Sequence, residues 1–124
     1  MRVSGAGVLT SRMPECVFCA IAAGDIPADV VADTPDTLAF RDLDPKAQVH
    51  VLVIPKGHFA NLGEVAAAEP GIAAAMITTA ARVAAVEGVA EGGYRLVANT
   101  GAGSGQTVFH AHLHLLAGSR LPGF

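Results

Sequence analysis

The sequence predicts an α+β domain built on an antiparallel sheet of about five strands. Short, β-branched and mostly apolar runs recur along the chain, separated by turns rich in proline, glycine and aspartate. One long alanine-rich segment instead repeats its larger apolar residues at offsets of three, four and seven, as a helix does. A chain of 124 residues normally forms one domain, and it can bury a core without disulfide bonds.

The N-terminal part of the chain consists of a segment without periodicity and a segment with helical periodicity. Residues 1–13 are small and polar without periodicity, which indicates a flexible arm ahead of a single domain over residues 14–124. Between Pro14 and Gly24 the apolar residues follow near-helical spacing, and a turn comes next. We therefore expect a short helix there.

Three strands are expected after this helix. Val30–Asp33 and Thr37–Asp42 flank a Thr-Pro-Asp turn, which is typical of a hairpin. Gln48–Ile54 is a third β-branched run, and Pro55 ends it.

The main helix is predicted over Asn61–Gly88. Pro70 suits a first turn, where a proline loses no intrahelical hydrogen bond, and Gly88 suits an end. Abundant alanine and little charge indicate a face buried against a second subunit as well as against the sheet.

The remaining sequence predicts two strands around a glycine turn. Tyr94–Asn99 is expected to be one strand and Val108–Leu116 the other, with Gly101–Gly105 between them.

Composition narrows the classes of function. A net charge of −3 with eight scattered Lys or Arg residues gives no basic field, so long nucleic acid is not an expected partner. The chain is 52% hydrophobic, yet it has neither an uninterrupted apolar run long enough for a membrane span nor a signal-peptide segment. We expect a cytoplasmic protein, and a small phosphorylated ligand remains compatible with this charge.

Three of the five histidines alternate with small or apolar residues at His110, His112 and His114. On a strand they would project from one face, with neighbours roughly 6.5–7 Å apart. Imidazoles act near neutral pH as nucleophiles, acids, bases or metal ligands, so this face predicts a chemical site. The alternative is a strand with histidines on its solvated face. A hydrolase with one zinc held by adjacent triad histidines conflicts with their spacing, because each Zn–N bond is only about 2 Å.

The segment over residues 105–116, GQTVFHAHLHLL, resembles the signature of the histidine triad (HIT) family. Three further blocks resemble that family's nucleotide-binding, HINT-like branch in order and spacing: CVFC with GDIP near the N-terminus, AFRDLDP, and HVLVIPKGH. The resemblance covers residues 15 to about 120. It implies a HIT-like fold of five antiparallel strands with one long and one short helix, and a homodimer whose sheets join. It further implies hydrolysis of purine nucleoside phosphoramidates, which are conjugates of a nucleotide with an amine.

The resemblance implies catalytic roles for three residues. His112 would be the nucleophile that forms a nucleotidyl-histidine intermediate, and it would need its attacking nitrogen free. His114 would donate to phosphate oxygens. Thr107 would place a hydroxyl near the leaving group, at a position where serine is expected.

The resemblance also implies a nucleotide site. Asp42 would accept hydrogen bonds from the ribose hydroxyls, and Asn99 would contact the phosphate-bearing end. Gly105, Gln106 and Thr107 would add phosphate contacts from the glycine turn. The base would lie in an apolar pocket lined by Val17, Phe18, Ile21, Ile26, Phe40 and Leu43.

Cys16 and Cys19 have the spacing at which two thiolates share a metal, although a redox pair has the same spacing. The resemblance supplies His58 and His110 as further ligands of one structural zinc per chain. His110 would then orient His112 through its carbonyl. His50 would either support the triad by hydrogen bonding or be an ordinary strand histidine.

Other functions remain open at this point. A dinucleoside polyphosphate hydrolase or a nucleotidyl transferase would use similar residues. A non-catalytic nucleotide-binding dimer would not need a nucleophile in the central position.

Overall fold

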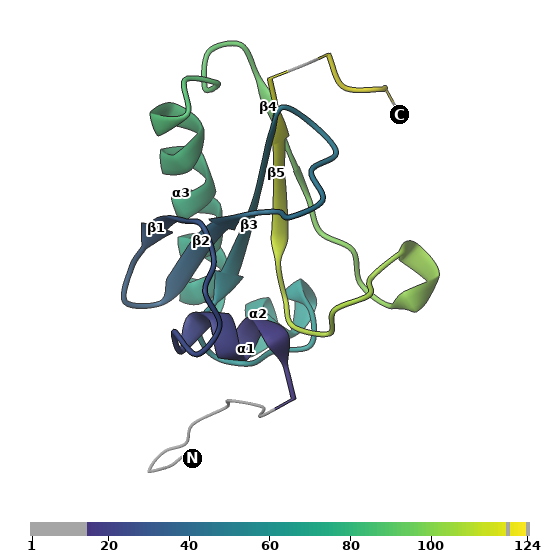
Figure 1. The fold of residues 1–124 in the computed structure, drawn as a ribbon. Coiled ribbons are helices and arrows are strands. Elements are labelled where there is room, and N and C mark those ends of the chain that lie inside the picture. The colour runs from purple at the N-terminus through teal and green to yellow at the C-terminus, as the bar shows by residue number, and fades with distance from the viewer. Residues whose placement is uncertain (1–14, 119, 124) are drawn as a thin grey trace.

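A computed structural model describes residues 15–118 and 120–123, so the predicted arm over residues 1–13 lies outside the described residues. The fold is a single five-stranded antiparallel sheet with helices packed on it (Figure 1). The strand order is β1-β2-β3-β5-β4. The strands are β1 (Val30–Asp33), β2 (Thr37–Arg41), β3 (Val49–Pro55), β4 (Tyr94–Val97) and β5 (Leu113–Ala117). The predicted α+β class and five-stranded sheet are confirmed.

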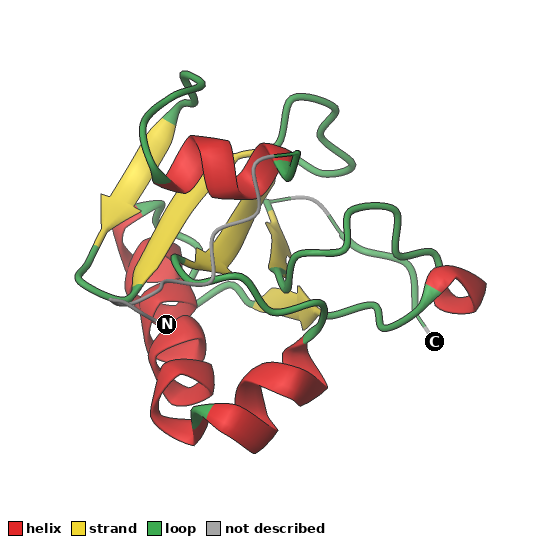
Figure 2. Ribbon diagram, turned by 90° about the horizontal axis from the view of Figure 1, so that it is seen from below, coloured by secondary structure: helices red, strands yellow, loops and turns green. Residues whose placement is uncertain are grey.

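Helices lie on both sides of the strands (Figure 2). They are α1 (Val17–Ala22), α2 (Leu62–Ala68) and α3 (Pro70–Val86), with the short 3-10 turn η1 (Ala102–Ser104). Within the described part of the chain, no helix is long and apolar enough to cross a membrane.

The prediction of one helix over residues 61–88 is wrong, because α2 and α3 are separate helices. Pro70 lacks an N–H and disfavours helical backbone at the preceding residue. Glu69 accordingly has φ −141° and ψ 72°, and Pro70 becomes the first residue of α3. The short N-terminal helix also starts later than predicted, at Val17.

The prediction that the last strand begins at Val108 is also wrong. Regular pairing of β5 begins at Leu113, opposite Val53 of β3. The preceding residues bond elsewhere: the amide of Ala111 donates to the carbonyl of Phe59 at 2.7 Å, and the ring of His110 bonds to the carbonyl of Pro55. His110 and His112 therefore precede the strand, and only His114 lies on it.

The sheet buries a core on each face. One face packs against α3 through residues such as Val53, Met76 and Leu115. On the opposite face, Phe18 of α1 packs with Phe40 and other alternate residues of β2 and β3. This second, smaller core holds α1 beside the histidines.

Candidate active site

An apolar cavity of about 310 Å³ lies between α1 and β2. This volume is at the small end of the range for ligand pockets. All six apolar residues predicted for a base pocket line it, although the Leu43 side chain is 99% exposed and so lies at its rim. The cavity is also lined by Pro27, Ala28, Asp29, Arg41, Leu52 and Val108, which sequence reasoning did not assign to it, because a motif does not show which of its residues face a cavity.

Asp42 lines the same cavity and is held by its own turn. Its Oδ1 accepts the backbone N–H of Asp44 at 2.8 Å. Its Oδ2 lies 3.4 Å from Nε2 of His50. Carboxylate oxygens have several lone pairs, so this arrangement leaves acceptor capacity for a ligand.

The ring of His112 is oriented by a backbone carbonyl. Its Nδ1 is 2.7 Å from the carbonyl oxygen of His110, and a carbonyl can only accept, so Nδ1 carries the proton. The lone pair of the neutral ring is therefore on Nε2. Phe18 packs edge-on against this ring with centroids 5.2 Å apart. This places His112 beside a residue that lines the apolar cavity.

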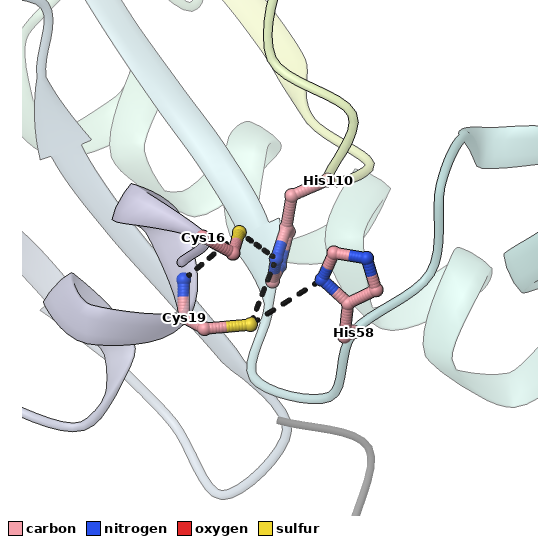
Figure 3. Close-up of side chains that lie close together, drawn as sticks. All are labelled: Cys16, Cys19, His58 and His110. Carbon is pink, nitrogen blue, oxygen red and sulfur yellow. Dashed lines mark hydrogen bonds between the residues drawn. The ribbon is translucent and has the colours of Figure 1, made fainter. Parts of the chain in front are cut away.

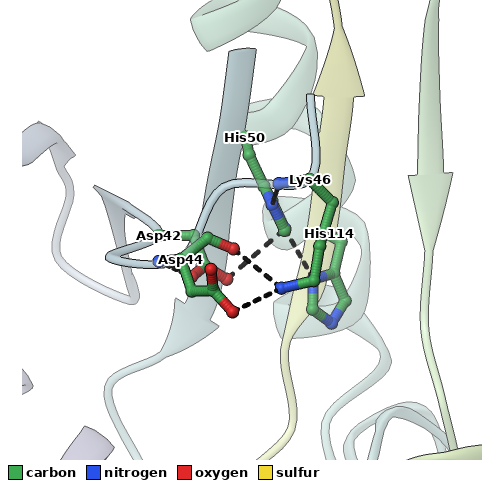
Figure 4. A network of polar contacts seen from close by, with 5 residues as sticks. All are labelled: Asp42, Asp44, Lys46, His50 and His114. Atoms are coloured by element: carbon green, nitrogen blue, oxygen red, sulfur yellow. Dashed lines mark hydrogen bonds and ion pairs between the residues drawn. The ribbon is translucent and has the colours of Figure 1, made fainter. Parts of the chain in front are cut away.

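His50 and His114 form a second oriented pair (Figure 4). The backbone N–H of Lys46 donates to Nδ1 of His50 at 2.9 Å, so the neutral ring of His50 carries its proton on Nε2. That Nε2 is 2.9 Å from Nδ1 of His114, which therefore accepts. His114 is left with its proton on Nε2, and this nitrogen can donate to a ligand.

Burial favours these neutral forms. It lowers the pKa of His50, partly opposed by the charge of Asp42. It also lowers the pKa of His114 to about 4, with further lowering from His112 and His50. At neutral pH both rings are uncharged, as the donor chain requires.

The lowered pKa of His114 predicts that the folded protein loses stability in acid. The pKa of His114 is about 4 in the fold and about 6.5 in the unfolded chain, so the unfolded state binds more protons between these values. The contribution of His114 to stability is present above pH 6.5 and is lost as pH falls towards 4. The free energy of unfolding, measured by urea titration across this range, should fall less steeply in His114→Asn than in the wild type. If the free energy of unfolding fell equally steeply with pH in both proteins, His114 would not be the group whose pKa is lowered by folding.

Asp42, His50 and His114 offer three ligand atoms within 4.8 Å of one another, but their hydrogen bonds disfavour a metal there. His50 could ligate through Nε2 only if that nitrogen lost its proton, and the Lys46 amide already occupies Nδ1. We therefore interpret this group as a hydrogen-bonded chain.

Cys16, Cys19, His58 and His110 form a different cluster, also within 4.8 Å (Figure 3). Nδ1 of His110 lies 3.4 Å from Sγ of Cys16 and 3.5 Å from Sγ of Cys19. Nδ1 of His58 lies 3.3 Å from Sγ of Cys19. The four predicted metal ligands are thus brought together from α1, the loop after β3 and the segment before β5.

The geometry of this cluster fits a tetrahedral metal ion. Bonds of about 2.3 Å to sulfur and 2.0–2.1 Å to nitrogen place sulfur and nitrogen about 3.5 Å apart on a tetrahedron. The Nε2 of His110 donates to the carbonyl of Pro55 at 2.9 Å, which leaves the Nδ1 lone pair directed at both sulfurs. Burial lowers the pKa of His110 to about 4, so the ring is neutral as a ligand must be. We therefore assign the cluster as a candidate metal site.

The glycine turn is shaped by Gln106. Gly101 and Gly105 have φ values of 85° and 105°, which favour glycine. The buried amide of Gln106 accepts the N–H of Gly101 and donates to the carbonyls of Ala60 and Val108. Both amide protons of Gln106 are thus used within the protein, so its side chain supports the loop in this structure.

Other predicted nucleotide contacts lie outside the apolar cavity. Thr107 lines a neighbouring open cleft of about 430 Å³ with His58 and Phe109. Asn99 is half-buried just beyond β4. Sequence reasoning missed the backbone amide of Lys46 that orients His50, because a backbone contact does not depend on the type of residue and so does not appear in a motif.

Comparisons with a family profile, with known sequences and with solved structures all relate the chain to HIT proteins. A profile of the HIT domain matches residues 23–121. A purine nucleoside phosphoramidase from Escherichia coli is 42% identical over 107 residues, covering 86% of this chain and 90% of that protein. A HIT-like protein from Synechococcus elongatus is 47% identical, covering 86% of this chain and 93% of its own length. The solved structure of a HIT family hydrolase from Clostridium thermocellum has a TM-score of 0.86 at 40% identity, covering 90% of this chain and 97% of that one.

Proposed function

Because the chain belongs to the HIT domain family, we propose that it hydrolyses purine nucleoside phosphoramidates at the α-phosphate. The name of the Escherichia coli relative supports this substrate class. The observation that carries the proposal is the orientation of His112, whose free Nε2 belongs to a ring packed on a wall of the apolar cavity. A nucleophile beside a cavity for a base fits a nucleotide substrate.

In the first step, Nε2 of His112 attacks phosphorus while the phosphorus–nitrogen bond to the leaving amine breaks, and the amine takes up a proton from solvent. The ring becomes positively charged, and its Nδ1–H remains bonded to the carbonyl of His110. In the second step, water attacks phosphorus and gives a proton back to solvent, the bond to His112 breaks, and nucleoside monophosphate is released. The imidazole returns to its neutral form.

Other groups position the phosphate. Nε2–H of His114 donates to a non-bridging oxygen, because the chain from Lys46 through His50 fixes the proton there. The hydroxyl of Thr107 serves the leaving group. Gly105 and Gln106, whose amides donate to the carbonyls of Ala102 and Gly101, shape the turn that approaches the phosphate. Asn99 contacts the phosphate-bearing end.

The nucleoside part of the substrate fits the cavity. The base lies among the apolar side chains of α1 and β2, and Leu43 covers it from the rim. Asp42, on the same cavity, accepts from the ribose hydroxyls through its remaining lone pairs.

We assign zinc to the candidate metal site, held by Cys16, Cys19, His58 and His110. Two thiolates and two imidazoles are a typical zinc ligand set, and four protein ligands leave no open position for substrate. When bound, zinc supplies a structural cross-link between α1 and the segment before β5.

We propose a cytoplasmic homodimer in which two sheets join. β4 is at one end of the sheet, and among the described residues no further strand pairs with its outer edge, where an edge strand of a second copy can add. The mass of the particle, measured by light scattering coupled to size exclusion, should equal that of two chains.

The proposal is tested by steady-state turnover of adenosine 5′-phosphoramidate and of diadenosine triphosphate by the purified protein. We expect kcat/KM for the phosphoramidate to exceed that for the triphosphate at least about tenfold, since differential transition-state binding sets such ratios. The reverse ratio would favour a dinucleoside polyphosphate hydrolase. Nucleotide binding without any turnover would favour a non-catalytic dimer.

A further inference from the structure

α1 carries parts of two different sites. Cys16 caps its N-terminus by accepting the amide of Cys19, and both sulfurs belong to the metal cluster. Val17, Phe18 and Ile21, on the same short segment, line the apolar cavity. Any force that positions α1 therefore acts on both the metal cluster and the cavity.

This helix depends on tertiary contacts for its position. It has only six residues, and neither end carries a charged side chain that would favour the helix dipole. Helices this short are not stable alone in water. The contacts that hold α1 include the packing of Phe18 in the smaller core with Phe40 and the approach of the two cysteines to His58 and His110.

A second connection runs through His110. Its ring nitrogen Nδ1 faces both sulfurs, while its carbonyl orients the ring of His112. The ring of Phe18 packs edge-on against both histidines, with centroids 5.9 Å from His110 and 5.2 Å from His112. Movement of α1 or of His110 would thus change the wall of the cavity and the orientation of His112 together.

We propose that occupation of the cluster of Cys16, Cys19, His58 and His110 by a metal ion and occupation of the apolar cavity by a nucleotide are energetically coupled, each tightening the other. The inference rests on the proposed function for the identity of the cavity ligand. The ion fixes α1 and His110, so the nucleotide no longer has to order them. Coupling is reciprocal, and a factor of about 10 lies within the usual range.

The test uses AMP and Zn²⁺ as probes with the full chain. Isothermal titration of AMP into zinc-loaded protein should give a Kd about tenfold lower than titration into protein depleted of metal by a chelator. In the reciprocal experiment, saturating AMP should tighten zinc binding by the same factor, measured by competition with a chromophoric chelator.

Two variants distinguish the effect of losing a metal ligand from the effect of changing the loop that carries it. His58→Asn removes a ligand and leaves the residues of α1 itself unchanged, and it should bind AMP with the affinity of metal-depleted protein whether or not zinc is added. Lys56→Gln changes an exposed cation in the same loop, ion-paired to Asp33, and it should keep the full effect of zinc.

Equal AMP affinities with and without zinc, at unchanged far-UV circular dichroism, would overturn the coupling and leave the hydrolase proposal intact. Absence of AMP binding in both states would overturn both proposals. Failure of the protein to retain zinc would also overturn the coupling, as would global unfolding on metal removal, because the ion would then serve the whole fold.

Discussion

His112→Ala should lower kcat/KM for adenosine 5′-phosphoramidate by a factor on the order of 10⁴ or more, as removal of a nucleophile does in other covalent enzymes. The reason is the orientation of the ring, whose Nδ1 is committed to the carbonyl of His110 and whose Nε2 lone pair is free to attack. His112 is only half-buried, so the variant should fold and bind AMP.

The measurement is single-turnover hydrolysis, with acid-quenched samples analysed for a nucleotidyl adduct by mass spectrometry. His114→Asn is the matched control, since it should slow the reaction yet still form the adduct on residue 112. Substantial turnover by His112→Ala, or an adduct on another side chain, would refute the assignment of the nucleophile.

The three alternating histidines show what the sequence pattern could predict. Period-two spacing predicted a group of imidazoles on one strand face, and in the structure the rings of His112 and His114 lie with centroids 5.0 Å apart. The pattern could not show that regular pairing stops at Leu113, because that depends on where Pro55 and Phe59 place their carbonyls. His110 consequently turns towards the cysteines, although its spacing matches that of the other two.

Contacts made by backbone groups were beyond sequence reasoning. The amide of Lys46 determines which nitrogen of His50 carries the proton, and this sets the donor on His114. Gln106 was expected to contact phosphate, whereas here both its amide protons reach backbone carbonyls. Such pairings arise when the chain folds over itself, and residue identity alone does not determine them.

The boundary between α2 and α3 also could not be predicted from apolar composition. The alanine-rich sequence continues from α2 into α3, so it predicted one element. Pro70 was assigned to a first turn, which is its place in α3, but the stretch before it was not separated. The missing boundary is Glu69, whose φ of −141° and ψ of 72° interrupt the helical backbone before Pro70. Asn61 marks the start of α2, since its side chain accepts the amide of Glu64 at 2.9 Å.

His110→Ala should have the largest effect on stability, lowering the free energy of unfolding of the zinc-loaded protein by about 3–5 kcal/mol. The imidazole is completely buried and packs against Phe18 and His58. Its loss leaves a ring-sized cavity, deprives the carbonyl of Pro55 of a donor and removes a metal ligand. The measurement is chemical denaturation at pH 7 with and without zinc.

His58→Ala is the matched control, because it also removes a ligand but at a half-buried position. Both variants should lose the stabilisation that zinc gives the wild type. In the presence of a chelator, His58→Ala should approach the metal-free wild type, whereas His110→Ala should stay less stable, since its cavity and its broken hydrogen bond do not depend on the ion. If His110→Ala matched the metal-free wild type, the ring would contribute only as a ligand, and neither its burial nor its bond to Pro55 would stabilise the fold.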